Sequence, residues 1–118
     1  MSNYRVIGQT VANRRRDRRI VMPPIHLELD GETYRTVDWS LGGFLVAPYA
    51  GALRPGAIVD VTIRIVVNDR ERRHPTEAEV LRVLRAERTL AGRFVRLDGA
   101  ALGSLESVIL ARMRPVTV

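Results

Sequence analysis

The stretch Val59-Asp60-Val61-Thr62-Ile63-Arg64-Ile65 decides the fold, because its apolar residues occupy every second position. Successive side chains of a β-strand point to opposite faces, so this pattern predicts a strand with one buried face and one face in water. Strand and helix patterns do not alternate along the chain, which argues against a parallel sheet. The sequence therefore predicts a mainly antiparallel β-sheet protein.

Further strands are expected on both sides of this stretch. Residues 25–29 and 32–37 form an expected hairpin around Asp30-Gly31, because both turn residues tolerate the positive φ of a type I′ turn. A short strand is expected at residues 44–46. On the C-terminal side, the polar residues 68–74 are expected to be a hairpin loop, and residues 76–84 pair with residues 90–97. The first of these strands loses its alternation at Val80-Leu81, which predicts a bulge or a barrel corner.

The last segment changes to a helical period. Leu102, Leu105, Ile109 and Met113 are spaced to share one helical face, and Pro115 ends the helix. Asp98 or Ser104 could cap it.

The predicted fold class is mainly all-β: a six-stranded antiparallel β-barrel with a C-terminal α-helix over one opening. Residues 1–13 are expected to be a flexible N-terminal arm, and residues 14–114 the barrel domain with its helix at about 99–113.

Composition excludes several classes of function. The 118 residues suffice for one domain, and the absence of cysteine excludes disulfides and thiolate metal sites. The two histidines, His26 and His74, cannot form a zinc or catalytic cluster alone, and no nucleophile–base pair, carboxylate pair or phosphate-binding glycine loop is present, so we do not expect an enzyme. No transmembrane span or signal peptide is recognisable, which predicts a cytoplasmic protein. The net charge of +6 favours anionic partners.

The run Arg14-Arg15-Arg16-Asp17-Arg18-Arg19 places five arginines in six positions. A guanidinium can grip a phosphate or a guanine edge with two parallel hydrogen bonds, which a lysine cannot do. The alternative interpretation is a solvated arm that attracts nucleic acid or acidic surfaces without geometric recognition.

The segment Asp38-Trp39-Ser40-Leu41-Gly42-Gly43 is a second candidate motif. Asp38 and Ser40 could simply bond backbone donors in a turn between strands. The functional interpretation is that Asp38 accepts hydrogen bonds from the N1–H and exocyclic amine of a guanine, Ser40 bonds a base edge or phosphate, and Gly43 lets the ligand approach the backbone.

Together these motifs resemble the two signatures of the PilZ domain family. Arg-x-x-x-Arg corresponds to Arg15 and Arg19, and Asp-x-Ser-x-x-Gly to Asp38, Ser40 and Gly43. Arg14 with Arg18 is an alternative register, but Arg19 leads directly into the apolar Ile20, as the second arginine does in the family. The stretch Gly92-Arg93-Phe94 is similar to the Gly-x-Phe last strand of PilZ domains, and the resemblance covers roughly residues 13–114.

The resemblance implies a PilZ-like split barrel that acts as a receptor for cyclic dimeric GMP (c-di-GMP) and has no other cofactor. Arg15 and Arg19 would clamp the ligand from the N-terminal arm, and the barrel surface with Asp38, Ser40 and Gly43 would hold a guanine. Arg14 stands where the family has an arginine associated with an intercalated ligand dimer, so a 2:1 complex is expected. Contacts from Arg16, Arg18 and Arg82 are left open.

The resemblance also implies a downstream partner protein in flagellar, chemotaxis or polysaccharide-synthesis machinery, and ligand binding would dock the arm and signal to it. The alternatives are a small basic barrel that binds RNA or single-stranded DNA, and a PilZ-like barrel that binds only protein. Few aromatic residues are available for base stacking, which disfavours nucleic acid. The receptor hypothesis requires Asp38 to lie beside the point where Ile20 enters the barrel.

Overall fold

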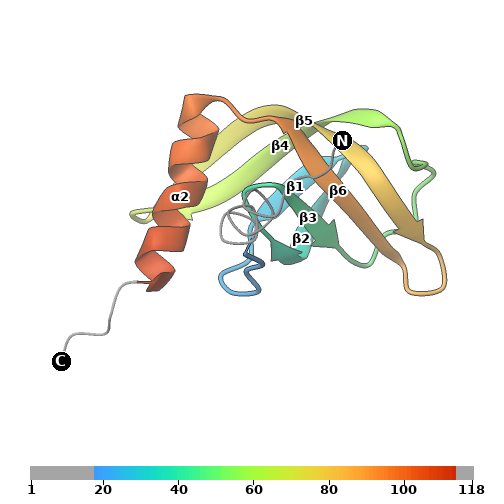
Figure 1. The fold of residues 1–118 in the computed structure, drawn as a ribbon, viewed down its shortest axis with the longest axis horizontal. Helices are drawn as coiled ribbons and strands as arrows, with labels where there is room; N and C mark the ends of the chain where they lie inside the picture. The colour runs from blue at the N-terminus through green and yellow to red at the C-terminus, as the bar shows by residue number, and fades with distance from the viewer. Residues whose placement is uncertain (1–17, 114–118) are drawn as a thin grey trace, which may run out of the picture.

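Residues 18–113 are described by a computed structural model, which contains six β-strands followed by one helix (Figure 1). The strands are β1 (His26–Leu29), β2 (Glu32–Trp39), β3 (Gly43–Val46), β4 (Ile58–Val67), β5 (Arg70–Leu84) and β6 (Thr89–Arg96), and the helix is α2 (Gly99–Met113). The expected arm at residues 1–13, and Arg14 to Asp17 after it, lie outside the described residues.

The strands form one closed antiparallel barrel in the order β1-β2-β3-β6-β5-β4. β1 closes the barrel because it pairs with both β2 and β4, and β3 crosses to pair with the distant β6. A closed barrel leaves none of these strands with an unpaired edge. The predicted fold class, a six-stranded antiparallel barrel with a C-terminal helix, is confirmed.

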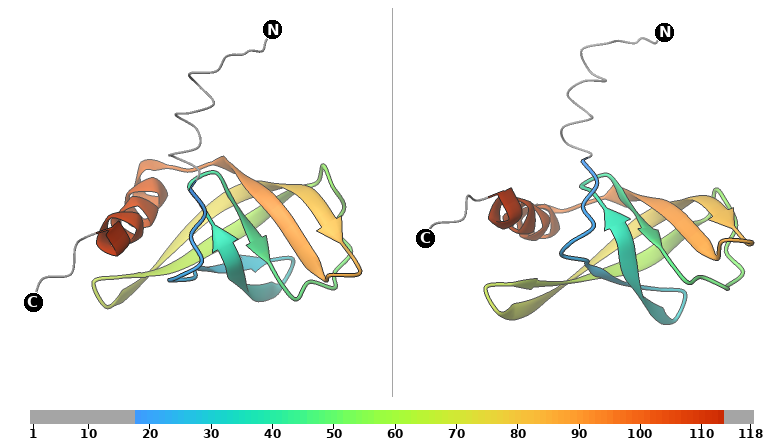
Figure 2. Two further views of the ribbon diagram at one scale, coloured as in Figure 1. Left: turned by 60° about the horizontal axis from the view of Figure 1, so that its bottom comes forward. Right: turned by 90° about the horizontal axis from the view of Figure 1, so that it is seen from below.

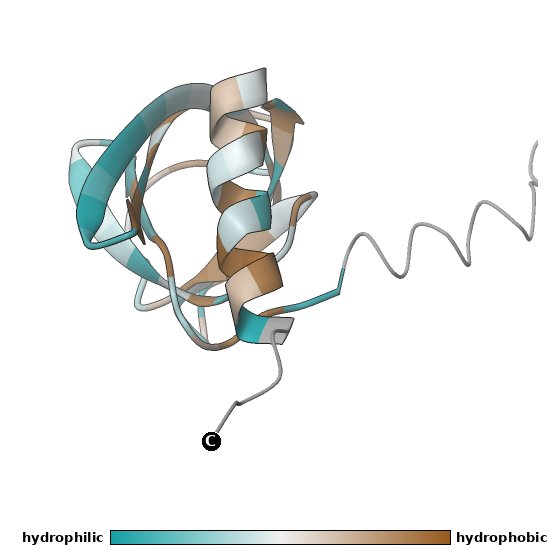
Figure 3. Cartoon of the chain, turned by 90° about the vertical axis from the view of Figure 1, so that its left-hand side faces the viewer, coloured by the Kyte–Doolittle hydropathy of each residue, from teal (hydrophilic) through white to brown (hydrophobic). Residues whose placement is uncertain are grey.

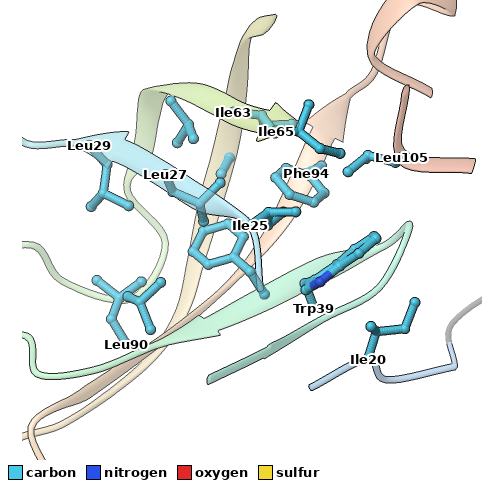
Figure 4. Close-up of a cluster of buried hydrophobic side chains, with 14 of the residues drawn as sticks. Ile20, Ile25, Leu27, Leu29, Trp39, Ile63, Ile65, Leu90, Phe94 and Leu105 are labelled. Atoms are coloured by element: carbon cyan, nitrogen blue, oxygen red, sulfur yellow. The ribbon is translucent and has the colours of Figure 1, made fainter. Parts of the chain in front are cut away.

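The alternating stretch in β4 lines the interior of this barrel. Val61, Ile63 and Ile65 are all buried, with at most 4% of any residue exposed, and Thr62 and Arg64 between them are partly exposed. Figure 4 shows Ile63 and Ile65 in a cluster that also contains side chains from β1, β2, β6 and α2. The period-two pattern therefore builds the core that fixes every strand in place.

The β1–β2 hairpin forms as its turn residues predict. Asp30 and Gly31 have φ values of 52° and 80°, which matches the two positive angles of a type I′ turn. The predicted irregularity in β5 is also present, since its register with β6 shifts between Val80 and Arg82.

The expected loop at residues 68–74 is wrong. The β4–β5 ladder continues to the pair Val67 and Arg70, so Asn68 and Asp69 alone form the turn, with φ values of 52° and 65°. The charged residues that suggested a loop form ion pairs across the sheet, such as Arg64 with Glu71. A strand whose charged side chains are paired on a solvated face looks like a loop in sequence.

Helix α2 begins at the predicted cap. The Asp98 side chain accepts a hydrogen bond from the Ala101 backbone N–H at 2.8 Å, which satisfies one of the free donors of the first turn. Leu105 is fully buried, and Ser104 Oγ lies 2.8 Å from Nε2 of His74 on β5. Figure 3, which looks at one end of the barrel, shows α2 lying across that opening. Ser104 therefore docks the helix and does not cap it.

Among residues 18–113, no helix is long and apolar enough to cross a membrane.

We predict that Gly92→Ala destabilises the barrel. A Cβ on Gly92 would lie 2.5 Å from the ring of Phe44, which is itself buried. Overpacking of this kind costs about 1–3 kcal/mol. Chemical denaturation should show a lower unfolding midpoint for this variant. The matched control is Gly103→Ala in α2, where a Cβ meets no atom within 4 Å, and its midpoint should stay level or rise. An unchanged midpoint for Gly92→Ala would contradict the packing argument.

Candidate functional site

The segment that enters the barrel lies against the end of β2. Ile20 and Trp39 exchange two backbone hydrogen bonds, of 2.7 Å from the Ile20 N–H and 3.0 Å from the Trp39 N–H. They form an isolated antiparallel bridge, and Figure 2 shows this part of the chain passing beside β2. The end of the arginine run is thereby fixed next to the Asp38–Gly43 segment, as the receptor hypothesis requires.

Arg19 contacts two residues of the second motif. Its Nε donates to Asp38 Oδ1 at 2.9 Å, Nη2 donates to the same oxygen, and Nη1 lies 3.4 Å from Ser40 Oγ. The Arg19 side chain is 48% exposed and that of Asp38 is 24% exposed, so both remain open to an incoming molecule. Arg14 and Arg15 lie outside the described residues.

Asp38 is positioned by a strand and not by a turn. The expected turn-like segment at 38–43 is shorter, because Asp38 and Trp39 are the last two residues of β2. Trp39 points into the core and is fully buried, and alternation therefore directs Asp38 outward. A carboxylate on a barrel strand is held more rigidly than one on a loop.

Trp39 also anchors the entering segment, a role that sequence reasoning missed. Its indole Nε1–H donates to the Pro23 carbonyl at 2.8 Å, while its backbone holds Ile20. Its place beside Asp38 in an alternating strand was the available signal for burial, but the partner residues were not visible in the sequence.

Ser40 is a structural residue of the turn. Its side chain is buried, and its Oγ accepts hydrogen bonds from the backbone N–H groups of Gly42 (3.1 Å) and Gly43 (3.3 Å). The interpretation of this segment as local turn chemistry therefore describes what Ser40 does. Its contact with a ligand stays a prediction, and the approach of Arg19 shows that the hydroxyl can be reached by a donor from outside.

Gly43 is required by the packing of two strands. It is buried in β3, and a Cβ there would collide with the backbone carbonyl oxygen of Gly92 on β6. Neighbouring backbone explains this glycine fully, and a ligand's approach to it stays a prediction.

The site offers hydrogen-bond and ionic chemistry. Within residues 18–113, no group of three or more histidine or carboxylate side chains could hold a metal ion. One exposed guanidinium, one carboxylate and one hydroxyl on a fixed strand end can bind a ligand that combines anionic groups with a donor edge.

We predict that Ser40→Ala and Asp38→Ala affect stability differently. Ser40→Ala leaves the Gly42 and Gly43 N–H groups without their acceptor, which costs about 1–3 kcal/mol. Asp38→Ala removes a partly exposed ion pair and should cost at most about 1 kcal/mol. Denaturant unfolding of both variants measures this. Equal losses would contradict the separation of a structural serine from an accessible carboxylate.

Comparisons with known proteins identify solved structures with a similar fold. No protein-family model matches the sequence, and a search of curated proteins finds no match. Among solved structures, the inhibitor of motility MotI/DgrA of Bacillus subtilis superposes with a TM-score of 0.67 at 22% identity, over 80% of this chain. The present chain spans about half of that one, namely 48%.

A second similar structure is the PilZ domain of CeSA from a cellulose-synthesising bacterium. Its TM-score is 0.56 at 20% identity, and the match covers 81% of this chain and 98% of that domain. This similarity agrees with the closed six-stranded barrel and its C-terminal helix. The chain therefore folds as a PilZ-like domain.

Proposed function

We propose that the protein is a non-enzymatic, cytoplasmic receptor for c-di-GMP. The observation that supports this most is the contact of Arg19 with both Asp38 and Ser40. It joins the last arginine of the run to the carboxylate and hydroxyl of the second motif, on a PilZ-like barrel. A guanine dinucleotide needs both an arginine clamp for its phosphates and acceptors for its guanine edge.

The Arg19–Asp38 pair suggests how guanine is recognised. Two N–H groups of Arg19 point at one carboxylate oxygen, Asp38 Oδ1. The N1–H and exocyclic amine of guanine are also a pair of adjacent donors that a carboxylate can accept. When the ligand binds, guanine therefore replaces Arg19 as the donor to Asp38. The Arg19 guanidinium then becomes free to bond a phosphate of the same ligand.

This exchange refines the expected docking of the arm. Arg19 is already held by Asp38, and Ile20 by Trp39, so the order transition concerns the arginines before Arg18. Repulsion between those arginines opposes their gathering on the barrel, and an anionic ligand removes this repulsion. The docked arm then presents an altered surface to a partner protein.

The two phosphates of each c-di-GMP molecule and the run of arginines also support a complex of two ligand molecules with one protein chain. Arg14 and Arg15 give the arm two adjacent guanidinium groups before Arg19, enough to contact a second, stacked ligand molecule. We propose that the dimer is intercalated and that Gly43 lies at the edge of the guanine site.

We propose the process that the receptor regulates from the two similar solved structures. One is an inhibitor of motility and the other comes from a cellulose-synthesising bacterium. We therefore expect the partner to belong to flagellar, chemotaxis or polysaccharide-synthesis machinery.

The placement of the aromatic residues disfavours the alternative of RNA or single-stranded DNA. Single-strand binding surfaces stack bases on exposed aromatic rings. Within residues 18–113, Trp39, Phe44, Tyr49 and Phe94 are buried, and Tyr34 is partly buried against Tyr49 with ring centroids 5.6 Å apart. None of these rings offers an open stacking platform.

We predict that Arg15→Ala and Arg19→Ala abolish measurable c-di-GMP binding. Hydrogen bonds to charged groups contribute about 1.5–3 kcal/mol each, so two or three such contacts supply most of the roughly 8 kcal/mol of a micromolar complex. Asp38→Ala should weaken binding and reduce discrimination against the adenine analogue, c-di-AMP. Isothermal titration calorimetry measures both and gives the stoichiometry.

The control is Arg70→Ala, which removes one positive charge from an exposed residue of β5 and should bind like wild type. If Arg19→Ala also binds like wild type, the clamp assignment is wrong. If every arginine variant loses affinity equally, binding depends on net charge alone.

We predict that c-di-GMP slows backbone hydrogen exchange in residues 5–20. The largest gain should fall before Arg18, because Ile20 already donates to the Trp39 carbonyl. Mass spectrometry with and without ligand measures this. Unchanged exchange throughout the segment would rule out docking of the arm.

A further inference from the structure

Arg93 lies in line with the proposed guanine site, on the far side of β3. In the β3–β6 register Gly43 is opposite Arg93, and the Ser40 N–H donates to the Gly43 carbonyl at 2.8 Å. Ser40, Gly43 and Arg93 therefore lie side by side on three adjacent segments of the barrel. Because Gly92 and Phe94 are buried, alternation directs Arg93 outward, onto the face to which Asp38 points.

The surface between Ser40 and Arg93 carries few protruding side chains. Neighbouring strands are about 4.8 Å apart, so the Arg93 backbone lies about 10 Å from that of Ser40. Gly43 has no side chain, and Ala91 and Leu45, which form the next outward-facing pair of the same register, are only partly exposed. A ligand held at Asp38 can therefore extend past Leu45 and over Gly43 towards Arg93.

Glu79 on β5 fixes the direction of the Arg93 side chain. Both Nε and Nη2 of Arg93 lie 2.7 Å from Glu79 Oε1, and the Arg93 side chain is 54% exposed. A guanidinium has five N–H donors, so this pairing leaves three of them free. A guanidinium oriented by a carboxylate on a neighbouring strand loses little further freedom when it binds.

From this arrangement we propose that Arg93 recognises the second guanine of the dinucleotide, through the O6 and N7 acceptors of its major-groove edge. This rests on the proposed function, since the first guanine is placed at Asp38. Arginine donates to O6 and N7 with two parallel hydrogen bonds. Phosphate is the less suitable partner, because Glu79 cancels the charge of Arg93 and repels a second anion. Arg93 then determines specificity and Glu79 positions it.

The experiment compares Arg93→Ala with Arg64→Ala. Arg64 is the matched control, because it is also a cross-strand arginine with a partly exposed side chain. Its Nε lies 2.6 Å from Glu71 Oε2, and it lies on β4, away from β3 and β6. That hydrogen bond lowers the pKa of Glu71. Both variants are titrated with c-di-GMP and c-di-AMP at several salt concentrations, and their unfolding midpoints are measured.

Arg93→Ala should lose about tenfold or more in c-di-GMP affinity, since it forfeits hydrogen bonds from a charged donor. The loss should be smaller for c-di-AMP, because adenine has an amine in place of O6. The salt dependence should stay near that of wild type, because no phosphate contact is lost. Arg64→Ala should bind both ligands like wild type.

The assignment to guanine would be overturned if Arg93→Ala binds like wild type. It would also be overturned if this variant loses affinity for both ligands equally and shows a shallower salt dependence. Arg93→Lys tests the same geometry without removing the charge and should fail to restore selectivity. If wild type itself does not bind c-di-GMP, the proposed function fails and the Arg93 assignment with it. Wild-type binding with an unaffected Arg93→Ala overturns the assignment alone.

Discussion

The bridge between Ile20 and Trp39 is the constraint on which the candidate site depends. Two backbone hydrogen bonds and the Trp39 indole bond to Pro23 attach the entering chain to the end of β2. Ile20 and Trp39 are both buried, so separating them would expose apolar surface and leave polar groups unpaired. Arg19 and Asp38, one residue before each of them, are thereby brought into contact.

The barrel supplies rigidity to a site that itself consists of few groups. Asp38 and Ser40 are attached to a strand end whose other face is core, and Arg93 is oriented by Glu79 on the neighbouring strand. Arg19, the last residue of the arginine run, contributes its side chain to this surface. In the proposed receptor, the ligand replaces Asp38 as a partner of Arg19, so that binding changes the contacts of the arm.

Much of the fold was predictable because it depends on local patterns. The alternation in residues 59–65, the Asp30-Gly31 turn and the helical spacing after Asp98 can each be recognised from a few neighbouring residues of the sequence. The charged strand at 70–74 was missed because its charges are compensated by partners on neighbouring strands, namely Arg64 on β4 for Glu71 and Glu28 on β1 for Arg73.

The candidate site was predictable in part for the same reason. The motif pattern indicated Arg19, Asp38 and Ser40, and the structure brings these three together. The motif pattern did not explain why Gly43 is a glycine, since the reason is the close backbone of β6. Nor did it indicate Arg93, which only the β3–β6 register brings beside Gly43. Pairing between strands that are not consecutive is a property of the topology, and no local pattern encodes it.

The central claim is that the outward surface around Asp38 binds c-di-GMP, and nuclear magnetic resonance mapping tests it most directly. In a titration of the ¹⁵N-labelled protein, backbone signals of Arg19, Asp38, Ser40 and Gly43 should shift most, together with the indole N–H of Trp39. Signals of the β4–β5 turn at Asn68 and Asp69, at the far end of the sheet ladder, should remain in place. Shifts confined to that turn and α2, or no shifts at all, would contradict the account.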